Sequence, residues 1–388
     1  MRTLNYLIFF PSLTFSVIAA EIFPWALLWS FTKKIKFSLI LALLMTLLVG
    51  ALASSMVLNG FQNALKDGLS VINPALAFIV MLSLSERSIS KYQNIAKNIF
   101  WFLIVLGILQ LSGILTPFTN IFEFIIPRGS AEVLGAGRGV SLLSSEPSRA
   151  GVEICFLYTV VRFKIDRQKK WLLDLIFFVF IVFVIKSAVA LVFCVILFTI
   201  MRPYISFLGI LLILNLLLIY SDNGIRSLIL ISQLLSSVNL MDLAHLIINQ
   251  SGFRIISVFS SYYYGIFHLF PSGFGSWPYL ILEAFHLAGF QASEISFFRI
   301  HGDGNFFSVK PTSFAAAFTL QQGLLIASMF FIFFYVGLRS KIQLNSIEGI
   351  ACLVIFLFYV FVVGAVGNPV PWICTALLIS KKIQKSHA

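Results

Sequence analysis

Residues 36–58 read KFSLILALLMTLLVGALASSMVL, and no charged residue follows Lys36 in this stretch. About 20 consecutive apolar residues are enough for an α-helix to cross the hydrocarbon core of a bilayer. The apolar run is continuous rather than alternating, so it indicates a helix and not a strand of a membrane barrel. The stretch therefore predicts a transmembrane helix.

The composition extends this prediction to the whole chain. Of 388 residues, 59% are apolar and 11% are charged, with a mean hydropathy of +0.99; an ordinary soluble domain has about 25% charged residues. A soluble fold of this size could not remove so much apolar surface from water. The 42 phenylalanines fit a surface that faces lipid. We therefore expect an all-α, polytopic membrane protein in which residues 1–388 form a single integral-membrane domain.

Further apolar runs indicate about twelve spans in total, several of them shorter than a straight crossing requires. For this reason we expect helical hairpins or half-helices over residues 4–32 and 171–201. Residues 1–20 also resemble a signal peptide, but an uncleaved first helix is the expectation when many spans follow. The expected spans are 4–20, 22–32, 36–58, 69–85, 98–116, 149–161, 171–185, 187–201, 203–220, 314–338, 347–366 and 368–380.

The net charge of +12 is explained by the orientation of the chain in the membrane. Lysines and arginines cluster in short polar segments between the apolar runs, which is the positive-inside pattern. With twelve spans, every such cluster falls in the cytoplasm together with both termini, so no nucleic-acid partner is expected. The clustered residues are Lys33, Lys34, Lys36, Arg87, Lys91, Lys97, Arg162, Lys164, Arg167, Lys169, Lys170, Arg202, Arg339, Lys341, Lys381, Lys382 and Lys385.

Two polar stretches then lie outside, at 117–148 and 221–313. The second, 93 residues long, far exceeds the usual connection between helices and is rich in apolar residues. It predicts helices that lie on the membrane surface. Lys186 is expected at the outer tip of the 171–201 hairpin, because at mid-bilayer it would cost about 2.5–3.5 kcal/mol. Glu348 also falls at the edge of a span.

The next helix after the first loop is expected to begin near Pro147. Proline suits the first turn of a helix, and Ser144 or Ser145 suits its N-cap. The free N–H groups of this first turn would then face the outer side of the membrane.

Charged residues around this predicted helix start form a candidate anion site. Arg138 and Arg149 lie on either side of it, and two arginines can bind a diphosphate through paired hydrogen bonds. Glu146 could act as a base beside them. The alternative is that Arg149 pairs with Glu146 or Glu153 at helical spacing.

A second candidate cluster follows Arg254. It contains three consecutive tyrosines and two glycines, which permit close approach of the backbone to a ligand. Aromatic faces suit the stacking of sugar rings, although an interfacial aromatic belt is the alternative for the tyrosines and a structural role is the alternative for the histidine. The candidate glycan-binding residues are Tyr263, His268, Gly273 and Gly275.

A third cluster precedes the expected helix at 314. His301, Asp303 and Asn305 alternate too briefly to predict a divalent cation site. Lys310 is the better candidate, for a phosphate, and its alternative is a lysine that reaches the membrane edge. The four cysteines lie within apolar segments without a CxxC pair, so no metal and no cofactor is expected.

These three clusters, in this order, resemble the Wzy-type O-antigen polymerases of the O-antigen polymerase and ligase superfamily. The resemblance covers the whole chain in size, span count and loop placement. Its local anchors are the segments 138–148, Arg254 with 271–275, and Lys310-Pro311-Thr312-Ser313-Phe314 leading to Gly323. The family often places Glu just before that glycine, where this chain has Gln321 and Gln322.

The resemblance implies a GT-C-like membrane glycosyltransferase with a large periplasmic loop in the bacterial inner membrane. Such enzymes join oligosaccharide repeat units carried on undecaprenyl diphosphate, without metal, in lipopolysaccharide biosynthesis. Membrane lipid and a chain-length regulator protein are the implied partners. On this basis Arg138, Arg254 and Lys310 would bind diphosphate, with Arg149 as a further candidate. Glu146 and His301 would compete for the role of base.

Two rival functions fit parts of the pattern. The related O-antigen ligase has the same loop plan and donor, and the Glu146-Pro147-Ser148 anchor favours the polymerase over it. A lipid-linked oligosaccharide flippase is permitted by twelve spans. However, transporters commonly have internal repeats and charges at mid-membrane, whereas here the charges lie in dissimilar external loops. A scaffold without catalytic activity is the remaining alternative.

Overall fold

The structure is a computed structural model, and it describes residues 2–14, 22–33, 38–126, 139–203, 252–291 and 310–382. Within these residues the architecture is helical, and the β pairing consists of an isolated bridge between Ile342 and Ser380. The helices up to residue 201 are α1 (Leu4–Leu7), α2 (Trp25–Phe31), α3 (Leu39–Asn59), α4 (Phe61–Ser83), α5 (Glu86–Leu111), α6 (Thr119–Ile125), α8 (Pro147–Lys164), α9 (Lys170–Val179) and α10 (Ala188–Met201).

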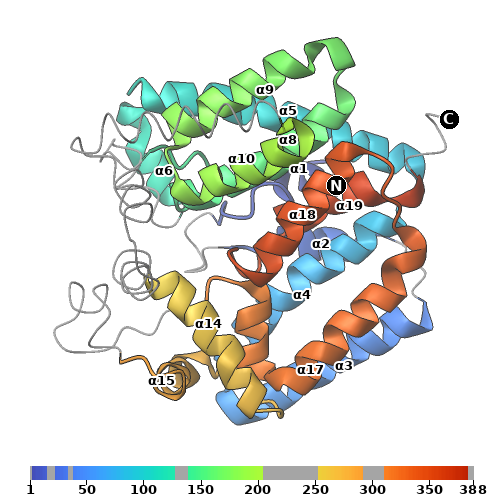
Figure 1. The fold of residues 1–388 in the computed structure, drawn as a ribbon, viewed down its shortest axis with the longest axis vertical. Coiled ribbons are helices and arrows are strands. Elements are labelled where there is room, and N and C mark those ends of the chain that lie inside the picture. The colour runs from blue at the N-terminus through green and yellow to red at the C-terminus, as the bar shows by residue number, and fades with distance from the viewer. Residues whose placement is uncertain are drawn as a thin grey trace.

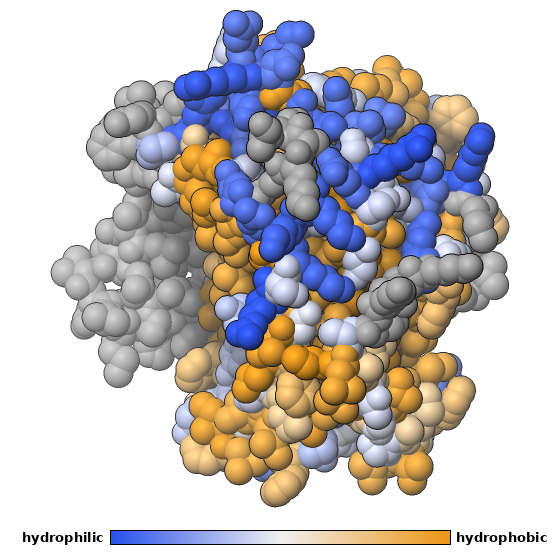
Figure 2. All heavy atoms as spheres, turned by 90° about the vertical axis from the view of Figure 1, so that its right-hand side faces the viewer, coloured by the Kyte–Doolittle hydropathy of each residue, from blue (hydrophilic) through white to orange (hydrophobic). Residues whose placement is uncertain are grey.

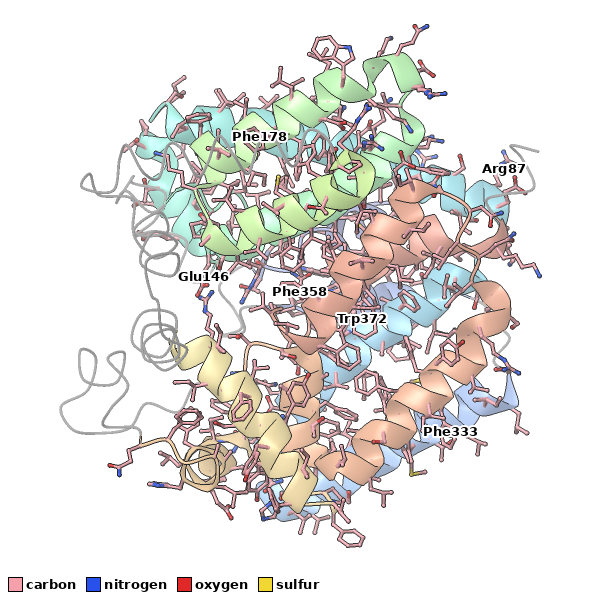
Figure 3. The ribbon with its side chains drawn as sticks, viewed as in Figure 1. Arg87, Glu146, Phe178, Phe333, Phe358 and Trp372 are labelled. Carbon is pink, nitrogen blue, oxygen red and sulfur yellow. The ribbon has the colours of Figure 1, made fainter. Side chains whose placement is uncertain are left out.

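The helices after residue 251 are α14 (Gly252–Phe267), α15 (Trp277–Leu287), α17 (Phe314–Leu338), α18 (Ile347–Phe361) and α19 (Val370–Ile379). Short 3-10 turns occupy Thr116–Phe118, Arg167–Lys169 and Arg339–Lys341, and a π-helical turn, η3, extends α9 over Phe180–Ile185. Figure 1 shows α14 and α15 together at one end of the bundle. Figure 3 labels Glu146 toward that end and Arg87 at the opposite one, and these two ends are called the Glu146 end and the Arg87 end below.

Four of the described helical segments are long and apolar enough to cross a membrane: Leu39–Asn59, Phe61–Ser83, Glu86–Leu111 and Phe314–Lys341. Three shorter apolar helices, α10, α18 and α19, accompany them. This is the composition of a helical membrane protein. The expected span at 203–220 lies outside the described residues, apart from Pro203.

Over 4–32, where hairpins or half-helices are expected, α1 ends at Leu7, Pro11 follows within turns and α2 begins at Trp25. The expected starts of two later spans are wrong. Helix α4 begins at Phe61 rather than 69, and α5 begins at Glu86 rather than 98. Both helices start earlier than expected because their first turns are amphipathic. Such turns contain polar residues, so they do not belong to a continuous apolar run of the sequence.

The 171–201 segment is a helical hairpin, as expected. Helix α9 with its π-helical extension runs to Ile185, Lys186 takes a left-handed conformation (φ 53°), and α10 begins at Ala188. Ser187 caps α10 by accepting from the backbone N–H of Ala190. Lys186 is exposed at the tip of the hairpin, so its charge is not buried within the protein.

The core centres on α19, whose residues are all buried although the helix is short. It packs against α4, α8 and α18. Trp372 contacts the rings of Phe78, Phe314 and Phe356 from three other helices (Figure 3). Helices α3 and α17 pack on the outside and leave large apolar side chains exposed, such as Leu39 and Ile332. Such surfaces are stable against lipid and not against water.

A buried charge cluster joins α8, α9, α10 and α18 at the Arg87 end. Asp174 accepts from Arg162 Nε at 2.9 Å and from Arg202 Nε at 3.0 Å. Glu348 accepts from Arg162 Nη1 at 2.6 Å and from Lys170 Nζ at 2.7 Å. The side chains of Arg162, Asp174 and Glu348 are only 4–5% exposed. Glu348, which the sequence places at the edge of a span, is therefore a paired interior residue.

Candidate functional site

The last part of the first loop, residues 139–146, is held at the Glu146 end by a side-chain amide. Gln110 of α5 donates to the Leu142 carbonyl and accepts from the Leu142 N–H, both at 3.0 Å. The amide thus pairs with Leu142 as a neighbouring strand would, and it satisfies backbone groups that are buried. Leu142 itself has a positive φ of 56°, which is costly for a residue with a branched side chain.

The same turn packs on the tip of the α9–α10 hairpin. The Val140 N–H donates to the Val184 carbonyl at 3.1 Å. Gly139 has a φ of 98°, and a Cβ at this position would lie 1.9 Å from the Ile185 carbonyl oxygen and 3.1 Å from Lys186 Cβ. The turn therefore requires glycine at 139, and it brings the end of the first loop beside Lys186.

Helix α8 begins where the sequence predicts it, with Pro147 in the first turn. The predicted cap is wrong, because the N-cap is Glu146 rather than Ser144 or Ser145. The Glu146 carbonyl accepts the first helical hydrogen bond, from the Ala150 N–H. Ser144 is instead turned inward and donates to the buried Glu153 carboxylate at 2.7 Å. Serine suits both an N-cap and a hydrogen bond to an interior carboxylate, so the residue type alone does not distinguish these two roles.

Glu146 meets Arg254 across 108 positions of sequence. Arg254 Nη2 lies 3.4 Å from Glu146 Oε2, and the two side chains are 42% and 40% exposed. Ser148 Oγ donates to the same carboxylate oxygen at 3.1 Å. The ion pair joins the first turn of α14 to the N-terminus of α8 (Figure 3). It is long and half-exposed, so both charges remain accessible to a ligand.

Three other candidates remain: the arginines of the predicted anion site, and His301 as the other candidate base. Arg149 lies half-buried in the first turn of α8. Arg138 and His301 lie outside the described residues. The alternative pairs Arg149 with Glu146 or Glu153. Arg254 is a cation that contacts Glu146, and the positive charge of Arg149 acts on Glu153.

Glu153 is a site residue that sequence reasoning considered only as a partner for Arg149. It is 6% exposed, and each oxygen accepts one hydrogen bond at 2.7 Å, from Ser144 Oγ and from Asn368 Nδ2. Asn368 in turn accepts from the Val370 N–H at the start of α19. The carboxylate therefore ties the loop before α8 to the loop before α19. The sequence signal was a single carboxylate within residues 150–161, which hold no other charge, because a charge in such a helix needs an interior partner.

Lys310 is paired within the protein. Its Nζ lies 3.0 Å from Asp67 Oδ1 and 3.2 Å from Ser70 Oγ, both on α4. Burial lowers the pKa of Lys310, and the Asp67 carboxylate partly offsets this by favouring the ammonium form. Asp67 was missed because α4 was expected to begin after it. Lys310 thus lies against α4, with its charge balanced by Asp67.

The loop between α18 and α19 links this lysine segment to the Glu153 network. The Gly364 N–H donates to the Thr312 carbonyl at 2.7 Å, and Asn73 Nδ2 donates to the Gly367 carbonyl at 3.1 Å. Asn368 of the same loop holds Glu153. This loop therefore ties α4, the start of α8 and the segment before α17 to one another.

The predicted glycine turn is packed against protein. Gly273 and Gly275 have φ values of 90° and 87°, and the nearest atoms to a Cβ there would lie 2.7 Å away in α3 and 3.0 Å away in α4, respectively. Gln321 binds the turn, since its carbonyl accepts from Gly273 and its side chain accepts from Gly275 at 2.7 Å. The close approach that these glycines permit is that of one chain segment to another. The neutral Gln321 has a structural role here.

The remaining candidates for glycan binding lie on α14. Tyr263 stacks with Phe259 and is half-buried. His268 stacks on Tyr264 with ring centroids 3.8 Å apart, and its Nε2 lies 3.9 Å from Glu283 Oε1. Both side chains remain partly accessible at the Glu146 end. Among the described residues, no three His, Cys, Asp or Glu side chains gather closely enough to hold a metal ion.

No model of a known protein family, no curated protein and no solved structure matches this chain.

Proposed function

We propose that this protein is an O-antigen polymerase: a glycosyltransferase that joins undecaprenyl-diphosphate-linked repeat units at the periplasmic face of the bacterial inner membrane. The observation that carries the proposal is the half-exposed Glu146–Arg254 pair, in which a carboxylate at a helix start meets an arginine from a distant surface helix. An acid and a cation that are adjacent and accessible are the two groups that transfer from a lipid diphosphate requires.

The proposed orientation puts the Glu146 end in the periplasm and both termini in the cytoplasm. It is supported by the basic side chains at the opposite end. Lys341 and Lys382 both bind Ser83, at the end of α4, and Arg87 follows at the start of α5. Cytoplasmic connections carry such an excess of lysine and arginine. Reporter fusions at the C-terminus that are active only in the periplasm would contradict the orientation.

In the proposed reaction, a hydroxyl of the acceptor glycan attacks the anomeric carbon of the donor. The new glycosidic C–O bond forms as the bond between that carbon and the diphosphate oxygen breaks. Undecaprenyl diphosphate leaves with the electron pair, and a base takes the hydroxyl proton. Arg254 would stabilise the charge that develops on the leaving diphosphate, with Arg138 beside it. Glu146 or His301 would be the base.

The loose ion pair gives Arg254 and Glu146 a coupled role in this reaction. A diphosphate carries more negative charge than a carboxylate, and it accepts two parallel hydrogen bonds from a guanidinium. On binding, it would draw Arg254 away from Glu146 and leave the carboxylate able to accept a proton. Lys310 would contribute less than the sequence suggested, because Asp67 already balances its charge.

The deciding experiment is the lipopolysaccharide ladder of a deletion strain that carries the variant gene. Arg254→Ala should abolish long chains while one repeat unit is retained, and Arg254→Lys should restore them in part. Glu123→Gln, an exposed acid of α6, is the matched control for Glu146→Gln. Loss of every O unit in the deletion strain would indicate the ligase or a flippase instead. Elongation of lipid-linked units by the purified protein in detergent would exclude the flippase.

A further inference from the structure

A cavity of about 1080 Å³ opens at the Arg87 end, far from the Glu146–Arg254 pair. It is lined by α1, by the first three turns of α5 and by the C-terminus of α8. Four cationic side chains line it, from these three separate segments: Arg2, Arg87, Lys91 and Lys164. Glu86 is the one carboxylate among its lining residues. The cavity therefore has an excess of positive charge.

The sequence of α5 explains why this cavity is polar. Arg87, Lys91, Asn94 and Asn98 follow one another at helical spacing, so they form a polar stripe along one face over three turns. The second half of the helix is apolar. A polar stripe of this length would be unfavourable against lipid. In the structure the stripe lines the cavity instead, with the two cations in the first turns of α5 and the two amides in the turns that follow.

Buried hydrogen bonds of α5 fix the rest of the cavity lining. Tyr92 donates to Asn5 Oδ1 at 2.6 Å and accepts from Trp29 Nε1 at 2.7 Å. Gln93 Nε2 donates to the Leu377 carbonyl at 2.9 Å. The amides of Asn5 and Gln93 are at most 8% exposed, yet both line the cavity. Tyr92 fixes the oxygen side of the Asn5 amide, and the Nδ2 group of the same side chain is a hydrogen-bond donor.

We propose that this cavity is a binding site for a phosphate group carried by an anionic ligand. Arginines and lysines from three segments, with an amide donor behind them, are the groups that bind phosphate in proteins. The volume exceeds that of a phosphate alone, so it accommodates a phosphate ester with its substituent. Figure 2 faces this end and shows hydrophilic side chains gathered over its upper part, with hydrophobic surface below. The ester can therefore come from an anionic phospholipid or from a soluble molecule.

The competing explanation for these basic residues is that they only set the orientation of the chain in the membrane, since cytoplasmic connections are generally rich in lysine and arginine. Positive-inside bias requires only a number of charges near the membrane. It does not require that they converge on one cavity. Charges of the same kind outside the cavity, Lys169 and Arg339, are exposed at the ends of neighbouring helices. They provide a matched control with the same change in net charge.

The test uses the full-length protein purified in a neutral detergent. Binding of phosphatidylglycerol, phosphatidylcholine, inorganic phosphate and glycerol 3-phosphate is measured by thermal shift and by native mass spectrometry. Wild type is compared with Arg87→Gln/Lys91→Gln and with Lys169→Gln/Arg339→Gln. Both pairs are exposed, so the variants should unfold at the temperature of the wild type without ligand.

We expect the Arg87→Gln/Lys91→Gln variant to bind the phosphate probe at least about tenfold more weakly, and the control variant to bind as the wild type does. Binding of phosphatidylglycerol but not of the soluble probes assigns the site to lipid. Binding of glycerol 3-phosphate or phosphate assigns it to a soluble ester. The proposal is overturned if neither phosphatidylglycerol nor a soluble probe binds the wild type more tightly than phosphatidylcholine does, or if both variants weaken binding equally. No outcome depends on glycosyltransferase activity.

Discussion

The buried charge cluster at the Arg87 end and the Glu146–Arg254 pair at the other end hold their charges in opposite ways. At the Arg87 end, Arg162, Asp174 and Glu348 are almost fully buried, with ion-pair distances of 2.6–3.0 Å. At the Glu146 end, the Glu146–Arg254 pair is 3.4 Å long and about 40% exposed. Tight, buried pairs fix helices, because separating them would leave a charge without a partner. A loose, exposed pair contributes little to stability and is free to exchange partners. The difference separates charges that hold the fold from charges that are available to a ligand.

Removal of Asp174 should have the largest effect on stability. The Asp174→Ala variant leaves Arg162 with one anionic partner instead of two and leaves Tyr158, which donates to Asp174, without an acceptor. We expect a loss of about 3–5 kcal/mol in the free energy of unfolding, as for other broken buried pairs. Unfolding of the purified protein in mixed detergent micelles measures it. A loss no larger than that of Glu146→Ala would remove the contrast between the two ends.

Glu146→Gln should have the converse effect, a large loss of activity with little loss of stability. If Glu146 is the base, its loss should slow elongation of lipid-linked units about 100-fold or more. Stability should change by less than about 1 kcal/mol, because the side chain is half-exposed. The measurement is the elongation rate of purified protein alongside its unfolding curve. An unchanged rate would transfer the role of base to His301.

The sequence predicted the parts of this arrangement that depend on local patterns. Apolar runs located α3 and α17, and Pro147 located the start of α8. The pairing of Glu146 with Arg254 could not be read in the same way, because it depends on how α14 lies against the bundle. The segments 138–148 and Arg254 were associated only through the family resemblance. The structure adds a direct contact between them.

Interior polar partners were the main omission of the sequence prediction. Gln110 and Asn368 bind backbone and carboxylate groups from distant segments, and nothing in their own neighbourhood marks them. Asp67 was placed before its helix because the amphipathic first turns of α4 hide the helix start. An apolar run therefore locates the middle of a span better than its polar end, and it is the polar ends that build the candidate site.

The Glu153 network should have an intermediate effect, because it resembles both ends: buried like the charge cluster, yet adjacent to the accessible pair. Glu153→Ala leaves the Ser144 hydroxyl and the Asn368 amide without an acceptor, at a cost of about 1–3 kcal/mol. Glu153→Gln keeps the shape and one acceptor, so part of the stability should return. Thermal unfolding of the two variants compares them. Equal destabilisation by both would show that the negative charge matters rather than the hydrogen bonds.

The smallest expected effect is the coupling energy between Glu146 and Arg254 themselves. A double-mutant cycle of Glu146→Ala and Arg254→Ala, measured by unfolding, should give less than about 1 kcal/mol. The matched cycle of Glu348→Ala and Arg162→Ala should give several-fold more, because both partners are buried and 2.6 Å apart. Added salt should weaken the first coupling and leave the second nearly unchanged, since screening acts mainly on exposed charges. A large, salt-resistant coupling for Glu146 and Arg254 would mean that the pair is closed to a competing anion, and the proposed exchange with a diphosphate would fail on that result.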